Sequence, residues 1–364
     1  MRKNSLLFAI ELYFPIMKVL ALLPNNSVIY FHRAHLYLPN GRKIEIPLGS
    51  RIKKIMCNLR FLIRLFRLEP RCATFLTNDI LIMTYLHKLW FISLSKAEII
   101  GSEDLRVGFS NVLNFCSMRS FGKEAVYYGD YGANAARDEI YIYKVDDSLH
   151  SKIVYTFPKN TITHIHNILY DKYRNRFFIF TGDKGDRVGI YTADSTFSNV
   201  TAYLIGQQSY RAVIGKVLAN GLLYATDAVM EDNYIYYVPF LDNRPQKIKA
   251  LNGSVIYGLI MNKGLVFSTT VEPRPSVPSK IITLTDNRRG KGIKSNRVDC
   301  LYISNDLVFH ELKSYKKDFL PMKLFQYGAV VFPSLYDEQG EISLLPISPV
   351  SVYRGDDKID YIKI

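Results

Sequence analysis

Two histidines and a series of acids have the residue types and spacing that could do chemistry. His164 and His166 open the apolar stretch "HIHNILYD", which leads into "FFIFTGD" and ends on Asp183. One intervening residue places both imidazoles on the same side of a strand. Such a pair would serve a metal site, a proton-transfer site or an ordinary strand edge. The fragment alone leaves all three interpretations open.

Similar units recur along the chain and give this fragment its context. Each unit is an apolar strand, a small or hydroxyl residue, an acid, a polar loop and a second strand rich in Ile and Tyr. The acids are Asp130, Asp183, Asp227 and Glu272, at intervals of 53, 44 and 45 residues. A period of about 40 to 50 residues is typical of a four-stranded antiparallel blade of a β-propeller.

Composition agrees with strands, since the chain holds 26 Tyr and 21 Phe, which favour extended structure. We predict an all-β protein, a β-propeller of six to eight four-stranded blades with seven favoured. Residues 1–26 form an N-terminal segment in this prediction, and residues 27–364 form a single propeller domain. A β-sandwich gives no reason for a fixed repeat, and a parallel α/β fold would need helices between the strands.

Propeller geometry predicts where the polar residues meet. The start of one strand and the end of its antiparallel neighbour lie at the same edge, so the acids and the residues that begin each blade should gather at one mouth of the channel. The catalytic candidates are Asp183, Asp227, His166 and Arg211. The candidates for substrate binding are Asp130, Asn134, Arg137, His164, Gln208, Asn233 and Glu272. The alternative is that acids at strand ends only close turns by accepting backbone N–H groups.

The stretch "HIHNILYDKYRNRFFIFTGDKGDRVGIYTADSTFSNV" resembles the sialidase-like, Asp-box class of propellers. In that class a blade carries a histidine-led strand, a T-G-D turn and then a box of the form S/T-x-D-x-G-x-T-W. "YTADSTFSNV" and "YKVDDSLHSKIV" are similar to the box in placement, with Asp194 and Asp146 present but Gly and Trp missing. The resemblance implies a glycan-facing propeller, as in bacterial surface-polysaccharide metabolism. It carries over no arginine triad, because no F-R-I-P-like segment is present.

Three chemistries remain open for the predicted cluster. Glycoside hydrolysis needs two carboxyl groups across the scissile bond, for which Asp183 and Asp227 are the first pair. A polysaccharide lyase would use His166 as base and Arg211 as the cation that neutralises a uronate carboxylate. A metal site would use the two histidines and Asp183. The chain offers no further well-placed histidine, so we expect neither a metal nor a cofactor.

The formal charge of +14 favours a polyanionic partner. An acidic glycan or polysaccharide, bound or also cleaved, is the leading hypothesis. A non-catalytic scaffold for protein partners is the alternative. Nucleic acid ranks third, because the basic residues are dispersed and no stacking platform is evident.

Residues 51–71, "RIKKIMCNLRFLIRLFRLEPR", predict a basic amphipathic helix at about 51–68. Its basic side holds Lys53, Arg60, Arg64 and Arg67, and its apolar side holds Ile55, Met56, Leu59, Leu62, Ile63 and Phe66. Such a helix can contact an anionic membrane peripherally.

The N-terminal apolar stretch is interrupted by Glu11, Pro15 and Lys18, which argues against an export signal or a membrane span. Four cysteines without a CxxC pair are consistent with reduced thiols. We therefore expect a cytoplasmic protein whose membrane contact is at most peripheral.

Overall fold

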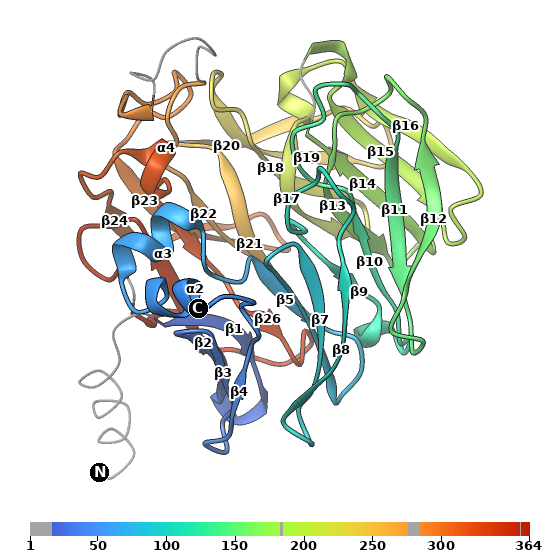
Figure 1. Ribbon diagram of the computed structural model, residues 1–364. Helices are drawn as coiled ribbons and strands as arrows, with labels where there is room; N and C mark the ends of the chain where they lie inside the picture. Colours follow the sequence, from blue (N-terminus) through green and yellow to red (C-terminus); the bar gives the residue numbers. More distant parts are fainter. Residues whose placement is uncertain (1–16, 183–184, 276–283, 357) are drawn as a thin grey trace.

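Seven sheets surround a common axis (Figure 1). The computed structural model describes residues 17–182, 185–275, 284–356 and 358–364. Consecutive strands pair in chain order within most sheets, and each sheet contacts its neighbours around the ring. The prediction of an all-β propeller with seven blades is confirmed.

The blades follow one another along the chain. Blades 1 and 2 contain β1 (Lys18–Leu22), β2 (Val28–His32), β3 (His35–Tyr37) and β4 (Lys43–Glu45), then β5 (Cys72–Phe75), β6 (Ile80–Tyr85), β7 (Lys88–Ser93) and β8 (Glu98–Asp104). Blades 3 and 4 contain β9 (Cys116–Ser117), β10 (Val126–Gly129), β11 (Ile140–Val145) and β12 (Ser151–Phe157), then β13 (Ile165–Asp171), β14 (Arg176–Thr181), β15 (Gly189–Asp194) and β16 (Val200–Ile205).

Blades 5 and 6 contain β17 (Ala212–Leu218), β18 (Gly221–Thr226), β19 (Asn233–Pro239) and β20 (Gln246–Leu251), then β21 (Val255–Met261), β22 (Gly264–Thr269), β23 (Arg297–Ser304) and β24 (Phe309–Lys316). Blade 7 has three strands, β25 (Ala329–Val331), β27 (Leu344–Val350) and β28 (Asp360–Lys363). Short 3₁₀ turns lie at Pro24–Asn26, Arg119–Phe121, Gly185–Arg187 and Gln208–Tyr210.

The hydrophobic core lies between neighbouring blades. Phe178 and Phe180 of β14 pack with Tyr224 of β18 in one buried cluster, and similar clusters join the other neighbouring pairs. The second strand of a blade is therefore covered on both faces, which explains why β18 is buried at all six positions. Strands covered on both faces read as continuous apolar runs, and these runs produced the repeat seen in the sequence.

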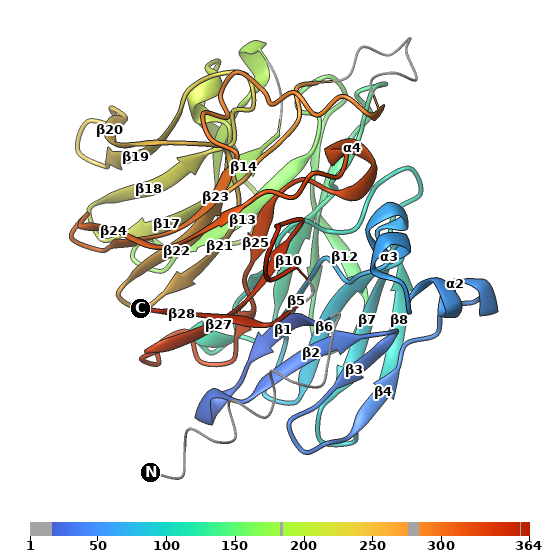
Figure 2. The ribbon, with the colours of Figure 1, turned by 90° about the vertical axis from the view of Figure 1, so that its left-hand side faces the viewer.

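The ring closes where the first and last blades meet, and Figure 2 shows β27 and β28 beside β1. The short strand β26 (Ser334–Leu335) pairs in parallel with β1. The Val19 N–H donates to the Ser348 hydroxyl of β27 at 2.8 Å. All five residues of β1 are buried. The propeller thus begins before residue 27, because this apolar segment is needed to complete the first blade and the closure.

In the part of the chain that the structure describes, helices are few and short. They are α2 (Arg51–Met56), α3 (Arg60–Phe66) and α4 (Met322–Phe325). The single helix predicted for residues 51–68 is divided, because Leu59 is extended and Cys57 is buried between the two halves. Within the described ranges, no helix has the length and apolar content needed to cross a membrane.

The closure predicts the effect of removing one hydroxyl. Ser348→Ala leaves the buried Val19 N–H without its acceptor, which should lower the free energy of unfolding by about 1–3 kcal/mol. Urea titration measures this change. Ser343→Ala, at an exposed position of the same blade, is the matched control and should change little. Equal effects of the two substitutions would contradict this role of Ser348.

Candidate functional site

One hydrogen bond recurs where the second strand of a blade passes to the third. The last side chain of the second strand, or the one just after it, accepts a backbone N–H near the start of the third strand at 2.9–3.1 Å. The four acceptors, in blades 3 to 6, are Asp130, Thr181, Thr226 and Thr269. Asp130 therefore occupies the position that threonine holds in the next three blades.

The residue after this acceptor lies on the opposite side of the strand, because successive side chains alternate. In blades 3 to 6 it is Tyr131, Gly182, Asp227 and Thr270. In three blades its N–H donates to the carbonyl of the residue just before the first strand. These bonds run from Gly182 to His164, from Asp227 to Arg211 and from Thr270 to Ser254, at 3.1, 2.8 and 2.8 Å. Corresponding positions of blades 4, 5 and 6 thus present His164, the pair Arg211–Asp227 and the pair Ser254–Thr270.

His164 and His166 form a close pair over Gly182. Their Nε2 atoms are 3.1 Å apart, and Nδ1 of His166 lies 2.9 Å from the Ala212 carbonyl. Because a carbonyl only accepts, Nδ1 of His166 carries a proton, and its Nε2 accepts from His164 when His166 is neutral. Burial holds the pKa of His166 well below its ordinary value, with the nearby charges of His164 and Arg211 acting in the same direction. Before Nε2 of His166 could accept a proton from a substrate, its hydrogen bond with His164 would have to break.

Arg211 and Asp227 form the buried ion pair of the next blade, with Nη2 and Oδ2 3.1 Å apart. Burial raises the pKa of Asp227 to about 7, Arg211 opposes this rise, and the Glu272 carboxylate adds to it. The other atoms of the pair, Nε of Arg211 and Oδ1 of Asp227, are buried without a hydrogen-bond partner among the described residues. Buried polar atoms are normally paired, so these two atoms retain hydrogen-bonding capacity that no described residue uses.

An arginine and three tyrosines complete the mouth. The guanidinium of Arg71 lies 4.6 Å from the centre of the Tyr131 ring, and that ring meets His164 edge-on with centroids 5.0 Å apart. Arg71 also interacts electrostatically with Tyr257 and Tyr327. We call the mouth cluster the set Arg71, Tyr131, His164, His166, Arg211, Asp227, Tyr257, Glu272 and Tyr327.

Glu272 joins the mouth cluster through hydroxyl groups. Its Oε1 accepts hydrogen bonds from Thr270 at 2.6 Å and from Ser254. Burial raises the pKa of Tyr327 well above its ordinary value, with Tyr257 and Glu272 acting in the same direction. These contacts extend the cluster from blade 5 across blade 6 to the start of blade 7.

The structure thus brings together five of the residues expected at the mouth, which are His164, His166, Arg211, Asp227 and Glu272. Asp183 lies outside the described residues. Gln208 is half-buried just before β17, and its Nε2 has no hydrogen-bond partner among the described residues. Asn134 hydrogen-bonds to Asp138 in its own loop. Asn233 hydrogen-bonds to Ala228 and Thr226 and to the Gly292 carbonyl of the next blade. Arg137 belongs to the same loop as Asn134, where its N–H donates to the Asn134 carbonyl.

Asp130 lies in a different place, a cavity of about 170 Å³ between blades 2 and 3. Its carboxylate pairs with Arg106 at 2.7 Å and accepts from the Tyr143 hydroxyl at 3.3 Å. The expectation that Asp130 faces the mouth is corrected here, because its threonine-like register turns it away and presents Tyr131 instead. Alternation within the strand end was the signal that could have identified Tyr131.

Among the described residues, no group of three or more His, Cys, Asp and Glu side chains is placed to hold a metal ion. The two imidazoles supply two nitrogens, and the third ligand of the metal interpretation, Asp183, lies outside the described residues. The described part of the mouth cluster therefore offers proton-transfer groups and cations.

Comparisons with known proteins show the fold and no family. No protein-family model matches the sequence, and no curated protein is significantly similar to it. A chain of the mitotic checkpoint complex aligns over 95% of this chain and 86% of its own, with 8% identity and a TM-score of 0.54. An oligogalacturonate lyase in complex with manganese aligns over 94% of this chain and 84% of its own, with 7% identity and a TM-score of 0.51. The extracellular domain of a putative one-component system from B. thetaiotaomicron aligns over 95% of this chain and 38% of that one, with 10% identity and a TM-score of 0.52.

Gly182→Ala tests the packing of the histidine pair. A Cβ at this position would lie 1.9 Å from Nε2 of His164 and 2.1 Å from Nε2 of His166, so the imidazoles must separate. We expect shifted imidazole signals in NMR spectra and a lower melting temperature. Gly101→Ala, whose Cβ would meet only Phe91 at 3.5 Å, is the control. Unchanged imidazole signals in Gly182→Ala would contradict the packing.

Asp227→Asn tests the raised carboxyl pKa. With a pKa of about 7 in the folded protein and an ordinary value of 3.8, the folded state binds the extra proton between these pH values. Wild-type stability should therefore fall as pH rises from about 4 to 7, by up to roughly 4 kcal/mol relative to the variant. Urea unfolding of both proteins across this range measures the difference, and parallel curves would contradict the shift.

Proposed function

We propose that the mouth cluster binds an acidic glycan through its carboxylate groups. The observation that carries this proposal is the convergence of Arg71 and Arg211 with aromatic rings and a histidine pair at one mouth. Nε of Arg211 and Oδ1 of Asp227, which have no hydrogen-bond partner among the described residues, add a donor and an acceptor to the cluster. Converging polar groups of this kind orient a ligand.

The chemistry of the cluster suits a carboxylate. A guanidinium offers paired donors that match a carboxylate, and Arg71 and Arg211 are both half-buried, so that each keeps part of its surface in reach of solvent. The half-buried rings of Tyr131, Tyr257 and Tyr327 give apolar surfaces with polar tips, against which a sugar ring can pack. The net charge of +14 draws polyanions to the protein.

Asp227 is the group that would move a proton if the bound glycan is also cleaved. With a pKa of about 7 it is ionised and protonated in similar amounts at neutral pH, which suits a general acid or base. Hydrolysis would need a second carboxyl group. Among the described residues, Glu272 supplies a carboxyl group that acts on Asp227. A lyase would use a base and a cation that neutralises the uronate, and Arg211 is placed for the second role.

The finer part of the proposal is a sialidase-like propeller of bacterial polysaccharide metabolism. Its support is local. Asp194 accepts four hydrogen bonds, from the hydroxyl and N–H of Thr196 and from the N–H groups of Ser198 and Asn199. Asp146 similarly accepts from Ser148 in the turn after β11. Both acids thus close the turn between the third and fourth strands, where the Asp-box resemblance places them.

A non-catalytic scaffold for protein partners is the alternative function. The observation in its favour is that Asp130, Asn134 and Asn233 close their own turns and so need no ligand. Under this alternative the mouth cluster stabilises the ring and binds no sugar.

Arg71→Gln and Arg211→Gln test glycan binding. The probe is a galacturonic acid oligomer, and its fully methyl-esterified form is the neutral control. We expect the acid form alone to bind in calorimetric titrations, and each substitution to weaken it about tenfold or more, because a charge-assisted hydrogen bond is lost. Arg297→Gln, an exposed arginine on β23, is the matched control.

Equal binding of the ester, or an equal loss in Arg297→Gln, would contradict the proposal. The absence of binding to galacturonic and sialic acid oligomers alike would favour the scaffold. If the acid oligomer is also cleaved, Asp227→Asn should retain binding and lose turnover.

A further inference from the structure

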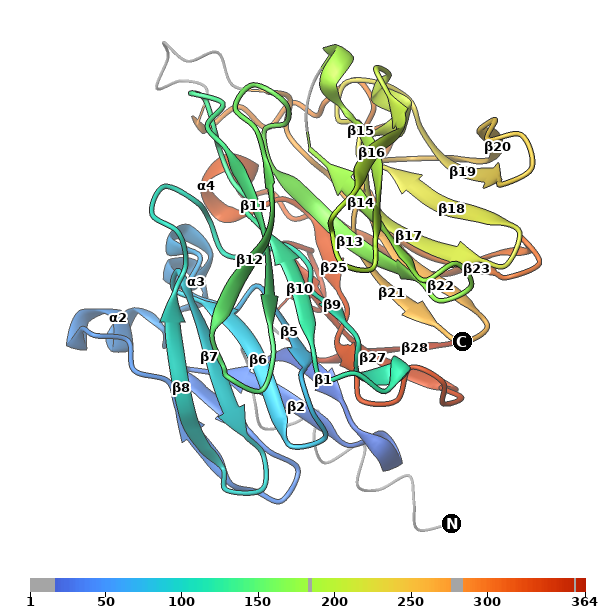
Figure 3. The ribbon, with the colours of Figure 1, turned by 90° about the vertical axis from the view of Figure 1, so that its right-hand side faces the viewer.

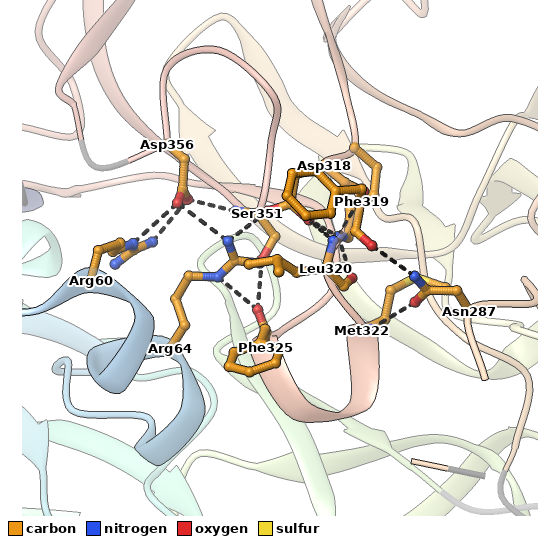
Figure 4. Close-up of polar contacts among 11 residues, drawn as sticks. Arg60, Arg64, Asn287, Asp318, Phe319, Leu320, Met322, Phe325, Ser351 and Asp356 are labelled. Atoms are coloured by element: carbon orange, nitrogen blue, oxygen red, sulfur yellow. Dashed lines mark hydrogen bonds and ion pairs between the residues drawn. The ribbon is translucent and has the colours of Figure 1, made fainter. Parts of the chain in front are cut away.

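Arg60 and Arg64 of α3 face the protein together with the buried Ile63, whereas Phe61 and Phe66 are exposed. Figure 4 shows Arg60 and Arg64 directed at the loops of the last blade. Arg60 donates from Nη2 and Nε to Asp356 at 2.9 and 3.2 Å and from Nη1 to Glu69 at 2.7 Å. A charge can be buried only when it is paired in this way.

Arg64 is the more deeply buried of the two, with 3% of its side chain exposed. Its Nε donates to the Phe325 carbonyl at 2.7 Å, Nη1 to Asp318 at 2.5 Å and Nη2 to the Ser351 hydroxyl at 2.6 Å. All three nitrogens are therefore satisfied by residues that lie more than 250 positions away in the chain. These hydrogen bonds and those of Arg60 fix the rotation of α3 about its own axis.

Large apolar side chains are exposed on both helices and on Leu59, which precedes α3. We call the helical patch the set Ile52, Ile55, Leu59, Phe61 and Phe66, whose exposed fractions range from 50% to 69%. Figures 2 and 3 show α2 projecting from the body of the propeller, with α3 beside it. Helices of soluble domains normally bury such residues, and a contiguous exposed apolar surface marks an interaction site.

The charged side chains within the segment that carries the helical patch are positive, and one of them, Lys54, pairs with the exposed Glu45 of β4. Arg51, Lys53, Lys54 and Arg67 are exposed, and the segment 51–67 contains no acidic residue. Phe319, on the loop that also supplies Asp318, is 80% exposed. Apolar side chains intermixed with lysine and arginine complement the acyl region and the headgroups of an anionic bilayer.

We propose that the helical patch docks the protein on an anionic lipid surface. Ile52, Ile55 and Leu59 enter the boundary between headgroups and acyl chains, and the flanking cations meet the phosphates. The contact differs from the helix expected at residues 51–68 in one respect, since Arg60 and Arg64 pair with the protein and leave the other cations to meet the phosphates. The proposal is independent of glycan binding at the mouth cluster.

The position of the helical patch orients the docked protein. Arg67 ends α3 and interacts electrostatically with Tyr257 and Tyr327 of the mouth cluster. A membrane at the helical patch therefore lies beside the mouth. Polyanions at a membrane surface would be within its reach.

Vesicle co-sedimentation tests the docking. The full-length protein should pellet with vesicles of phosphatidylcholine and phosphatidylserine and stay in solution with phosphatidylcholine alone. Added salt should weaken the binding, because the cations contribute. Combined Ile52→Ser, Ile55→Ser and Leu59→Ser should reduce the partition coefficient about tenfold or more. Phe61 is left unchanged because its ring packs on that of Phe325, with the ring centroids 4.3 Å apart.

Leu241→Ser is the matched control, an exposed apolar residue between β19 and β20, and should bind vesicles as the wild type does. Equal melting temperatures of the three proteins establish that each is folded. Unchanged partition of the triple variant, or no preference for phosphatidylserine, would overturn the proposal. A dimer in sedimentation velocity that the triple variant abolishes would assign the helical patch to a second copy of the chain and overturn it as well.

Discussion

In blades 3 to 6, a hydrogen bond joins the start of the third strand to the side chain at the end of the second, and the mouth depends on this constraint. Each such bond contributes about 1 kcal/mol to stability, but its larger effect is to fix which residue at the strand end faces which side. The accepting position is taken by Asp130, Thr181, Thr226 or Thr269, and alternation then turns the following side chain to the opposite side. Tyr131 and Asp227 reach the mouth by this route, and Gly182 makes room there for two imidazoles.

Burial and charge decide what these positions can do. Asp227 is withdrawn from water beside one arginine and one carboxylate, so its pKa rises to about 7. His166 is buried beside a second imidazole and Arg211, so its pKa falls and it stays neutral. Two groups with opposite pKa shifts in adjacent blades are typical of a site that handles protons. Nε of Arg211 and Oδ1 of Asp227 have no hydrogen-bond partner among the described residues, which supports the proposal that this pair meets a ligand.

Buried arginines act differently at α3. Arg60 donates to Asp356 and Glu69, and Arg64 donates to Asp318, Phe325 and Ser351. Removing one partner of such a pair is costly. The ion pairs therefore hold the short helices in an orientation that hydrophobic burial alone would not produce. An apolar surface is left in solvent as the direct consequence. Its neighbour Arg67 interacts with tyrosines of the mouth cluster, so the two proposed binding surfaces lie close together.

The sequence by itself determined the class of fold and its repeat, because strands buried on both faces must be apolar along their whole length and polar turns must separate them. It also identified His164, His166, Arg211, Asp227 and Glu272 as residues that meet, since a blade period places equivalent strand ends at one edge. Only the tertiary structure decided that Asp130 faces the cavity between blades 2 and 3, because a shift of one residue reverses a side chain and the period cannot detect it. The orientation of α3 was likewise undetermined, because the carboxylates that bury Arg60 and Arg64 come from the last blade, across most of the chain.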